Sequence, residues 1–208
     1  MNKFLLLSIP LLFSCNDTTV EADDGVESAI EEQPEMITMR IDFGEQANDG
    51  WFVMNDDVMG GVSIGDTYIT ETSIVFEGEV STNNNGGFVS MRSPNGEYDL
   101  ADYTMLEISY RSEGHDFTMI MADEMLWYMP EFKLDLIPQS SDWTTVTTPL
   151  SDFKQYAMTG YGETETGVEM SSQALSEIVR LELRNSVFAS GDFRLEIDYI
   201  EFQAYLED

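Results

Sequence analysis

Apolar and polar residues alternate with a period of two along most of the chain from Met36 onward. Such alternation is typical of β-strands that bury one face. It predicts about ten short strands, at residues 37–43, 51–53, 68–70, 73–80, 87–92, 105–111, 117–121, 132–136, 144–149, 179–185 and 193–205. Residues 171–178 have a helical pattern instead, with Ser171 or Ser172 as the expected N-cap.

Turn-forming residues separate the predicted strands, at 48–50, 60–61, 83–86, 94–96 and 191–192. Short strands with a turn roughly every ten residues are characteristic of two-sheet β proteins. We therefore predict an all-β fold, a jelly-roll β-sandwich, built as one domain by residues 36–208.

The last predicted strand has an interruption in its pattern. Apolar residues occupy every second position from Phe193 to Tyr199 and then shift phase to Ile200 and Phe202. A shift of one residue moves side chains to the opposite face, so the pattern predicts a β-bulge or a strand end near residue 199.

The N-terminus is typical of a lipoprotein signal peptide. Lys3 supplies a positive charge, and the apolar run at 4–13 is about half as long as a membrane-spanning helix. It leads through Leu-Phe-Ser into Cys15, the only cysteine of the chain. We expect a signal peptide at 1–14, lipidation of Cys15, and an acidic, disordered tether at 15–35. The protein would then lie outside the cytoplasm, anchored by lipid to the cell envelope, at the outer membrane.

Charge excludes two classes of partner. The chain has 40 acidic and 9 basic residues, a formal net charge of −31. Nucleic acids need cations to neutralise their phosphates, and anionic lipid head groups would be repelled. We therefore expect no nucleic-acid binding, and membrane contact through the N-terminal lipid alone.

Three segments form a more specific pattern. Residues 51–63 read Trp-Phe-Val-Met-Asn-Asp-Asp-Val-Met-Gly-Gly-Val-Ser, residues 85–92 read Asn-Gly-Gly-Phe-Val-Ser-Met-Arg, and residues 191–200 read Gly-Asp-Phe-Arg-Leu-Glu-Ile-Asp-Tyr-Ile. In this order and spacing they resemble the complex I intermediate-associated protein 30 family. The resemblance extends from about Ile41 to Tyr205 and implies a galactose-binding-like sandwich, in agreement with the strand pattern.

The resemblance also implies a function. The best-known members of this family help to assemble respiratory complex I in mitochondria, as chaperones that catalyse no reaction. Because the signal peptide directs this chain out of the cytoplasm, the resemblance implies a non-catalytic binding or assembly domain for a protein of the cell envelope. The candidate residues for its binding crevice are those of the motifs: Trp51, Asn55, Asp56, Met59, Gly60, Gly61, Ser63, Gly86, Gly87, Phe88 and Arg92.

The same motif has a structural interpretation. Short polar side chains before paired glycines can hydrogen-bond to loop amides while the glycines adopt backbone angles closed to other residues. Glycines also allow a ligand to approach closely, so a crevice between Asp56 and Gly87 is the functional alternative. Arg92 is one of few cations, and we expect a buried ion pair between it and Asp56 or Asp57.

Aromatic residues support a second function, the binding of a carbohydrate by a surface lipoprotein. Trp127, Tyr128 and Trp143 are candidates for stacking against sugar rings. The alternative is that both tryptophans fill the interior of the sandwich.

Metal sites have weaker support. Met119, Met121, Met125 and Met129 follow His115, and thioethers with an imidazole suit Cu(I). Met119 and Met121 are two residues apart on a strand and share one face, which favours packing in the core. A structural calcium ion near Asp123 or Asp192 fits the oxygen-rich loops; otherwise we expect no cofactor.

Catalysis has little support in the sequence. A serine or cysteine triad would rest on His115, the single histidine, and no nucleophile motif lies near it. We therefore expect no enzyme; hydrolysis by a pair of carboxylates is the third and weakest alternative.

Overall fold

The computed structural model describes residues 35–44, 50–126, 128–160, 162–185 and 190–205. The predicted signal peptide, Cys15 and nearly all of the predicted tether lie outside these ranges. In the part of the chain that is described, no helix has the length and apolar character to cross a membrane.

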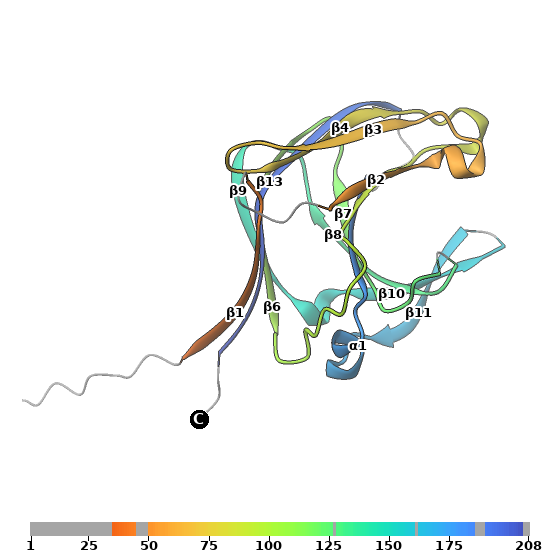
Figure 1. Ribbon diagram of the computed structural model, residues 1–208. Helices are drawn as coiled ribbons and strands as arrows, with labels where there is room; N and C mark the ends of the chain where they lie inside the picture. Colours follow the sequence, from red (N-terminus) through yellow and green to blue (C-terminus); the bar gives the residue numbers. More distant parts are fainter. Residues whose placement is uncertain (1–34, 45–49, 127, 161, 186–189, 206–208) are drawn as a thin grey trace, which may run out of the picture. The chain divides into compact units, whose positions relative to one another are not determined.

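Within the described residues, thirteen strands form two antiparallel sheets that face each other (Figure 1). Sheet A contains β1 (Met36–Asp42), β3 (Ile64–Ile69), β4 (Ile74–Val80), β6 (Met105–Glu113), β9 (Ser140–Pro149) and β13 (Gly191–Tyr205). Its order is β3-β4-β13-β6-β9, and β1 pairs with β13.

Sheet B contains β2 (Phe52–Asn55), β5 (Val89–Arg92), β7 (Phe117–Ala122), β8 (Glu131–Ile137), β10 (Lys154–Thr159), β11 (Gly162–Glu169) and β12 (Arg180–Asn185). Its order is β11-β10-β8-β7-β12-β5-β2. The predicted all-β sandwich is confirmed.

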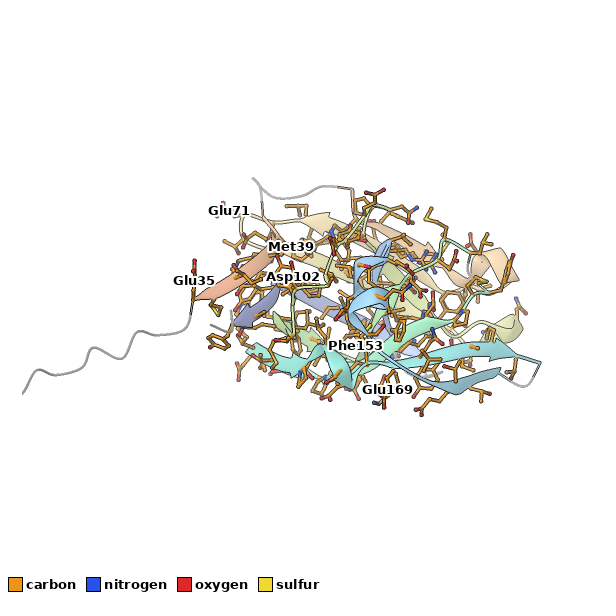
Figure 2. The ribbon with its side chains drawn as sticks, turned by 90° about the horizontal axis from the view of Figure 1, so that it is seen from below. Glu35, Met39, Glu71, Asp102, Phe153 and Glu169 are labelled. Atoms are coloured by element: carbon orange, nitrogen blue, oxygen red, sulfur yellow. The ribbon has the colours of Figure 1, made fainter. Side chains whose placement is uncertain are left out.

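The core lies between the two sheets. Phe76 of β4, Phe117 of β7 and Phe193 of β13 form an aromatic cluster at its centre, with ring centroids 4.8 to 6.0 Å apart. Phe153 is wholly buried, whereas Glu169 is exposed; both are labelled in Figure 2. The alternation seen in the sequence therefore reflects one core-facing row of side chains on each central strand.

The predicted bulge in β13 is confirmed. The pairing of β13 with β6 shifts register between Ile197 and Tyr199. The extra residue allows Ile197 before the shift, and Ile200 and Phe202 after it, all to face the core. Without it, the second half of the strand would point its apolar side chains to solvent.

One predicted strand was too short and one hairpin was missed. Residues 68–70 were expected as a strand, whereas β3 is longer and begins at Ile64. The hairpin β10–β11 was not predicted, because every residue of β11 is exposed and the segment lacks apolar alternation.

The short helix α1 (Ser172–Ser176) is present, and Ser171 is its N-cap, accepting a hydrogen bond from Ala174 N.

The methionines Met119 and Met121 are wholly buried in the core, as predicted. His115 is also buried, with its ring against Phe193 at a centroid distance of 6.1 Å.

The aromatic cluster makes a prediction about stability. Replacement of Phe117 by alanine should lower the free energy of unfolding by about 3–5 kcal/mol, because it leaves a cavity beside Phe76 and Phe193. Urea unfolding measures this loss. Tyr205→Ala is the matched control, since Tyr205 is 63% exposed at a strand end, and it should change stability by less than about 0.5 kcal/mol. Equal effects of the two substitutions would contradict this packing.

Candidate binding face

The carboxylate of Asp56 holds two loops together. Its Oδ1 accepts a hydrogen bond from Ser63 N at 3.0 Å, and its Oδ2 accepts from Ser63 Oγ at 2.6 Å and from Gly87 N at 2.8 Å. Asp56 is wholly buried. Burial alone would raise its pKa, but the hydrogen bonds from Ser63 and Gly87 outweigh burial and lower it.

The glycines around Asp56 are required by space. A Cβ atom on Gly61 would lie 2.2 Å from the Asp56 carboxylate, and one on Gly86 would lie 2.5 Å from it. Gly60 has a φ of 88° and ends the 3₁₀ turn η1 (Asp56–Met59). These contacts support the structural interpretation of the motif, since the chain itself occupies the oxygens of Asp56.

Most other motif residues also have structural partners. Trp51 packs against Phe43 with ring centroids 5.3 Å apart, and Asn55 Oδ1 accepts a hydrogen bond from Gly65 N. Phe88 and Arg92, in contrast, contact charged residues on the outer face of sheet B.

The expected ion pair between Arg92 and Asp56 or Asp57 was wrong. Arg92 Nε lies 2.8 Å from Glu182 Oε2 instead. Arg92 and Glu182 are direct register partners on neighbouring strands β5 and β12, and directly opposed residues share one face of a sheet.

Arg92 is part of an ion-pair network across the outer face of sheet B. Arg184 binds Glu182 at 2.6 Å, Arg180 binds Glu131 at 3.0 Å, and Lys133 binds both Glu131 and Glu163. We call this set the charged network; its members are Arg92, Glu131, Lys133, Glu163, Arg180, Glu182 and Arg184. It joins strands β5, β12, β8 and β11.

The charged network requires a concave face. Arg184 Nη1 lies 3.7 Å from Glu163 Oε1, although β12 and β11 are four strands apart. On a flat sheet their backbones would be about 19 Å apart, farther than one arginine and one glutamate side chain can reach together. The β10–β11 hairpin must therefore curve over the outer face. In Figure 1 this hairpin and β2 both project to the same side of β7 and β8.

This curvature explains why the charges are buried on an outer face. The side chains of Glu182, Arg180 and Lys133 are 0%, 5% and 9% exposed. Burial alone would raise the pKa of Glu182, but the charges of Arg184, Arg92 and Arg180 outweigh it and lower the pKa. Glu182 is therefore ionised at neutral pH.

Several polar atoms of this face lack a hydrogen bond. Within the described residues, the buried side-chain atoms without a hydrogen-bond partner are Trp51 Nε1, Ser90 Oγ, Arg92 Nε, Arg180 Nε and Glu182 Oε2. All but the first belong to the outer face of sheet B. Three of these atoms, Arg92 Nε, Arg180 Nε and Glu182 Oε2, are ion-paired with one another at 2.8 and 3.6 Å. Among the described residues of this face, Ser90 Oγ is therefore the buried atom with neither a hydrogen bond nor an ionic partner.

Aromatic side chains lie at both ends of the face. Tyr156 of β10 is opposite Glu131, and Phe52 of β2 is opposite Arg92. Tyr128, a predicted ligand aromatic, is 53% exposed in the loop before β8. Trp127 lies outside the described residues.

Trp143 lies elsewhere, on the outer face of sheet A. It is 44% exposed, with the guanidinium of Arg111 5.1 Å from its ring centre, so the alternative that it fills the sandwich was wrong. A pocket of about 240 Å³ lies beside Arg111 and Glu196. Glu196 there accepts hydrogen bonds from Ser73, Arg111 and Arg194, so its carboxylate is already satisfied.

The charged network was missed from the sequence, although a signal existed. Arg180, Glu182 and Arg184 alternate with the core residues Leu181 and Leu183. Such alternation predicts a strand whose charged face is solvated. Burial of that face depends on the β10–β11 hairpin, which the pattern did not reveal.

Metal ligands are not gathered in the described part of the chain: it contains no group of three or more His, Cys, Asp or Glu residues arranged to hold an ion. Burial and the nearby charges of Glu124, Glu177 and Glu131 raise the pKa of Asp123, one of the two residues considered for calcium.

Comparisons with known proteins agree with this architecture. Residues 41–197 match the family described as complex I intermediate-associated protein 30. A search of curated proteins found no match. A family 11 carbohydrate-binding module from Clostridium thermocellum, in complex with a β-1,3-1,4-mixed-linked tetrasaccharide, has a similar fold, with a TM-score of 0.60 and 17% identity over 82% of this chain and 98% of that one. The solution structure of the module CtCBM11 gives a TM-score of 0.52 and 15% identity over 82% and 96%.

The hydrogen bonds from Ser63 and Gly87 to the Asp56 carboxylate predict that stability depends on pH. Asp56→Asn should lower the free energy of unfolding at pH 7 by about 1.5–3 kcal/mol, because it weakens charge-assisted hydrogen bonds to Ser63 and Gly87. The folded-state pKa is lowered, so this contribution is complete above the ordinary aspartate pKa of about 3.9 and is lost as the pH falls through the folded value.

Urea unfolding between pH 7 and pH 2 tests this dependence. The difference in the free energy of unfolding between wild type and Asp56→Asn should become smaller toward pH 2. Asp57→Asn is the matched control, since Asp57 is exposed, and it should leave stability unchanged at every pH. If Asp57→Asn lowered the free energy of unfolding as much as Asp56→Asn does, the stabilising role of the Asp56 hydrogen bonds would be ruled out.

Proposed function

Because the chain belongs to the complex I intermediate-associated protein 30 family and carries a concave polar face, we propose that it is a non-catalytic binding domain for a glycan. The glycan lies across the outer face of sheet B. The observation that carries this proposal is the row of guanidinium and carboxylate groups on that face, at Arg92, Arg180, Glu182 and Arg184, beside the aromatic side chains of Phe52 and Tyr156.

The chemistry of the face suits sugar hydroxyls. A hydroxyl both donates and accepts, so it can bind to a guanidinium on one side and to a carboxylate on the other. Alternating arginines and glutamates supply both partners. Tyr156 and Phe52 add apolar surfaces against which the C–H face of a sugar ring can pack.

The similar fold adds support. The Clostridium thermocellum module, whose fold this chain shares, is in complex with a tetrasaccharide. The charged network has members on β5, β12, β8 and β11, four strands of the sheet. A face built from several strands favours a chain of sugars over a single ring.

Absence of catalysis is part of the proposal. Glycoside hydrolysis requires one carboxylic acid with a raised pKa to protonate the leaving oxygen. Glu182 at the centre of the face has a lowered pKa, which does not suit that role. Asp123, whose pKa is raised, follows β7 directly and is not a member of the charged network.

A protein partner is the second candidate, in line with the assembly role implied by the family. The observation that favours it is the loop between β7 and β8, where Met125, Leu126 and Tyr128 are each at least 50% exposed. Clusters of exposed apolar side chains are typical of protein-binding surfaces. Capture of one stoichiometric envelope protein by the full-length chain, lost on Leu126→Ser, would support this candidate.

Glycan binding is tested with a glycan array and with tryptophan fluorescence titration of the full-length protein. Tyr156→Ala should weaken binding at least about tenfold, the loss of one aromatic–sugar contact worth about 1.4 kcal/mol. Trp143→Ala is the matched control, because Trp143 is an exposed aromatic on the other sheet, and it should leave affinity unchanged. A silent array, or an equal loss with Trp143→Ala, would contradict the proposed face.

The lipid anchor is a further part of the proposal. Cys15 follows an apolar run typical of lipoprotein signal peptides. Intact-protein mass spectrometry of the detergent-extracted chain should show loss of residues 1–14 and the mass of attached acyl chains. Cys15→Ser should abolish both and release the protein from membranes. An unmodified Cys15 in the mature protein would contradict the anchor.

A further inference from the structure

The charged network contains one more cation than carboxylate. Its cations are Arg92, Lys133, Arg180 and Arg184, and its carboxylates are Glu131, Glu163 and Glu182. Exposed Asp135 and Glu165 and the cation Lys154 lie at the rim of the same face. Glu163 is 40% exposed, so the buried and half-buried part of the network holds four cations and two carboxylates. In a chain with 40 acidic and 9 basic residues, such a local surplus of positive charge is opposite to the overall composition.

The surplus positive charge of the network is that of Arg92. Glu182 already binds Arg184 through two hydrogen bonds of 2.8 and 2.6 Å, made by Arg184 Nε and Nη2. Arg92 reaches the other oxygen of Glu182 through Nε, at 2.8 Å but without the alignment of a hydrogen bond. Among the described residues, Glu182 is the one ionic partner of Arg92, whose side chain is 14% exposed.

The surroundings of Arg92 form a small subsite. Ser90 lies two residues before it on β5, so both side chains point to the outer face. The hydroxyl of Ser90 is buried and, within the described part of the chain, has no hydrogen-bond partner. Phe52 is directly opposite Arg92 on β2 and is 39% exposed. The subsite therefore combines a partly exposed guanidinium with an exposed apolar ring surface on the neighbouring strand.

Resting on the glycan-binding function proposed above, we propose that the ligand is an acidic glycan. Its carboxylate or sulfate group binds to the Nη groups of Arg92, while the sugar ring packs against Phe52. The planar guanidinium matches the geometry of such anions, and a buried cation is stabilised when an anion completes its pairing.

The net charge of the whole chain acts against this ligand at long range. A charge of −31 repels a polyanion when salt is low. At an ionic strength of 0.15 M the screening length is about 8 Å, so the local surplus at Arg92 governs affinity there. Binding is therefore measured at this ionic strength or above.

Two pairs of polymers test the proposal by calorimetry with the full-length protein. Polygalacturonate and its fully methyl-esterified form differ by the carboxylate charge, and dextran sulfate and dextran differ by the sulfate. The acidic member of at least one pair should bind at least about tenfold more tightly than its neutral partner, the scale of one charge-assisted contact. The pair that responds identifies the anion as carboxylate or sulfate.

Arg92→Lys tests the residue itself. Lysine retains the positive charge but lacks the planar guanidinium with its two parallel N–H donors. The preference for the acidic polymer should therefore fall at least about fivefold, while the midpoint of thermal unfolding should change little. Arg111→Lys, on the outer face of sheet A, is the matched control and should leave the preference unchanged. A preference that survives Arg92→Lys would overturn the assignment of Arg92.

The outcomes separate this inference from the function on which it rests. Equal affinity for acidic and neutral polymers, lost on Tyr156→Ala, would overturn the acidic ligand and leave glycan binding intact. Absence of binding to every polymer and to the glycan array would overturn both.

Discussion

Burial of the Glu182 carboxylate among Arg92, Arg180 and Arg184 is the interaction on which the outer face of sheet B depends. A carboxylate without exposure to water is tolerated because three guanidinium groups surround it. Arg180 and Arg184 in turn reach Glu131, and Arg184 also reaches Glu163 on the β10–β11 hairpin. The network therefore connects the centre of the sheet to its edge and stabilises the curved conformation.

The charged network links the curvature of sheet B to the placement of polar groups on its outer face. An exposed ion pair contributes little to stability, whereas a buried pair that loses one partner is strongly destabilising. The face thus resembles a preorganised site, with donors and acceptors already held in place. The pocket on sheet A is likewise held by hydrogen bonds, which join Glu196 to Ser73, Arg111 and Arg194.

The family motif has a different role from the binding face. Asp56 joins Ser63 and Gly87, and Gly61 and Gly86 leave the space that its carboxylate needs. Most of the motif therefore specifies a loop arrangement of the fold, and membership of the family by itself identifies the architecture. Arg92, at the end of the second motif segment, is where the motif reaches the outer face of sheet B.

The sequence alone determined the features that depend on local pattern. Alternation predicted the sandwich and the bulge near Tyr199, since a residue's face on a strand follows from its position along the chain. The paired glycines after Asp56 predicted hydrogen bonds between polar side chains and loop amides. The spacing of Met119 and Met121 on one strand face predicted that both are buried in the core. Each of these inferences requires knowledge of neighbours in sequence, which the chain itself supplies.

Only the tertiary structure decided the partner of Arg92 and the burial of the charged face. Glu182 lies 90 positions away from Arg92, and strand order alone brings them opposite each other. The exposed β11 carries no apolar alternation, so its pattern did not reveal the hairpin that curves over the face. A charge on a strand is solvated or buried according to what covers it, and that cover comes from distant segments of the chain.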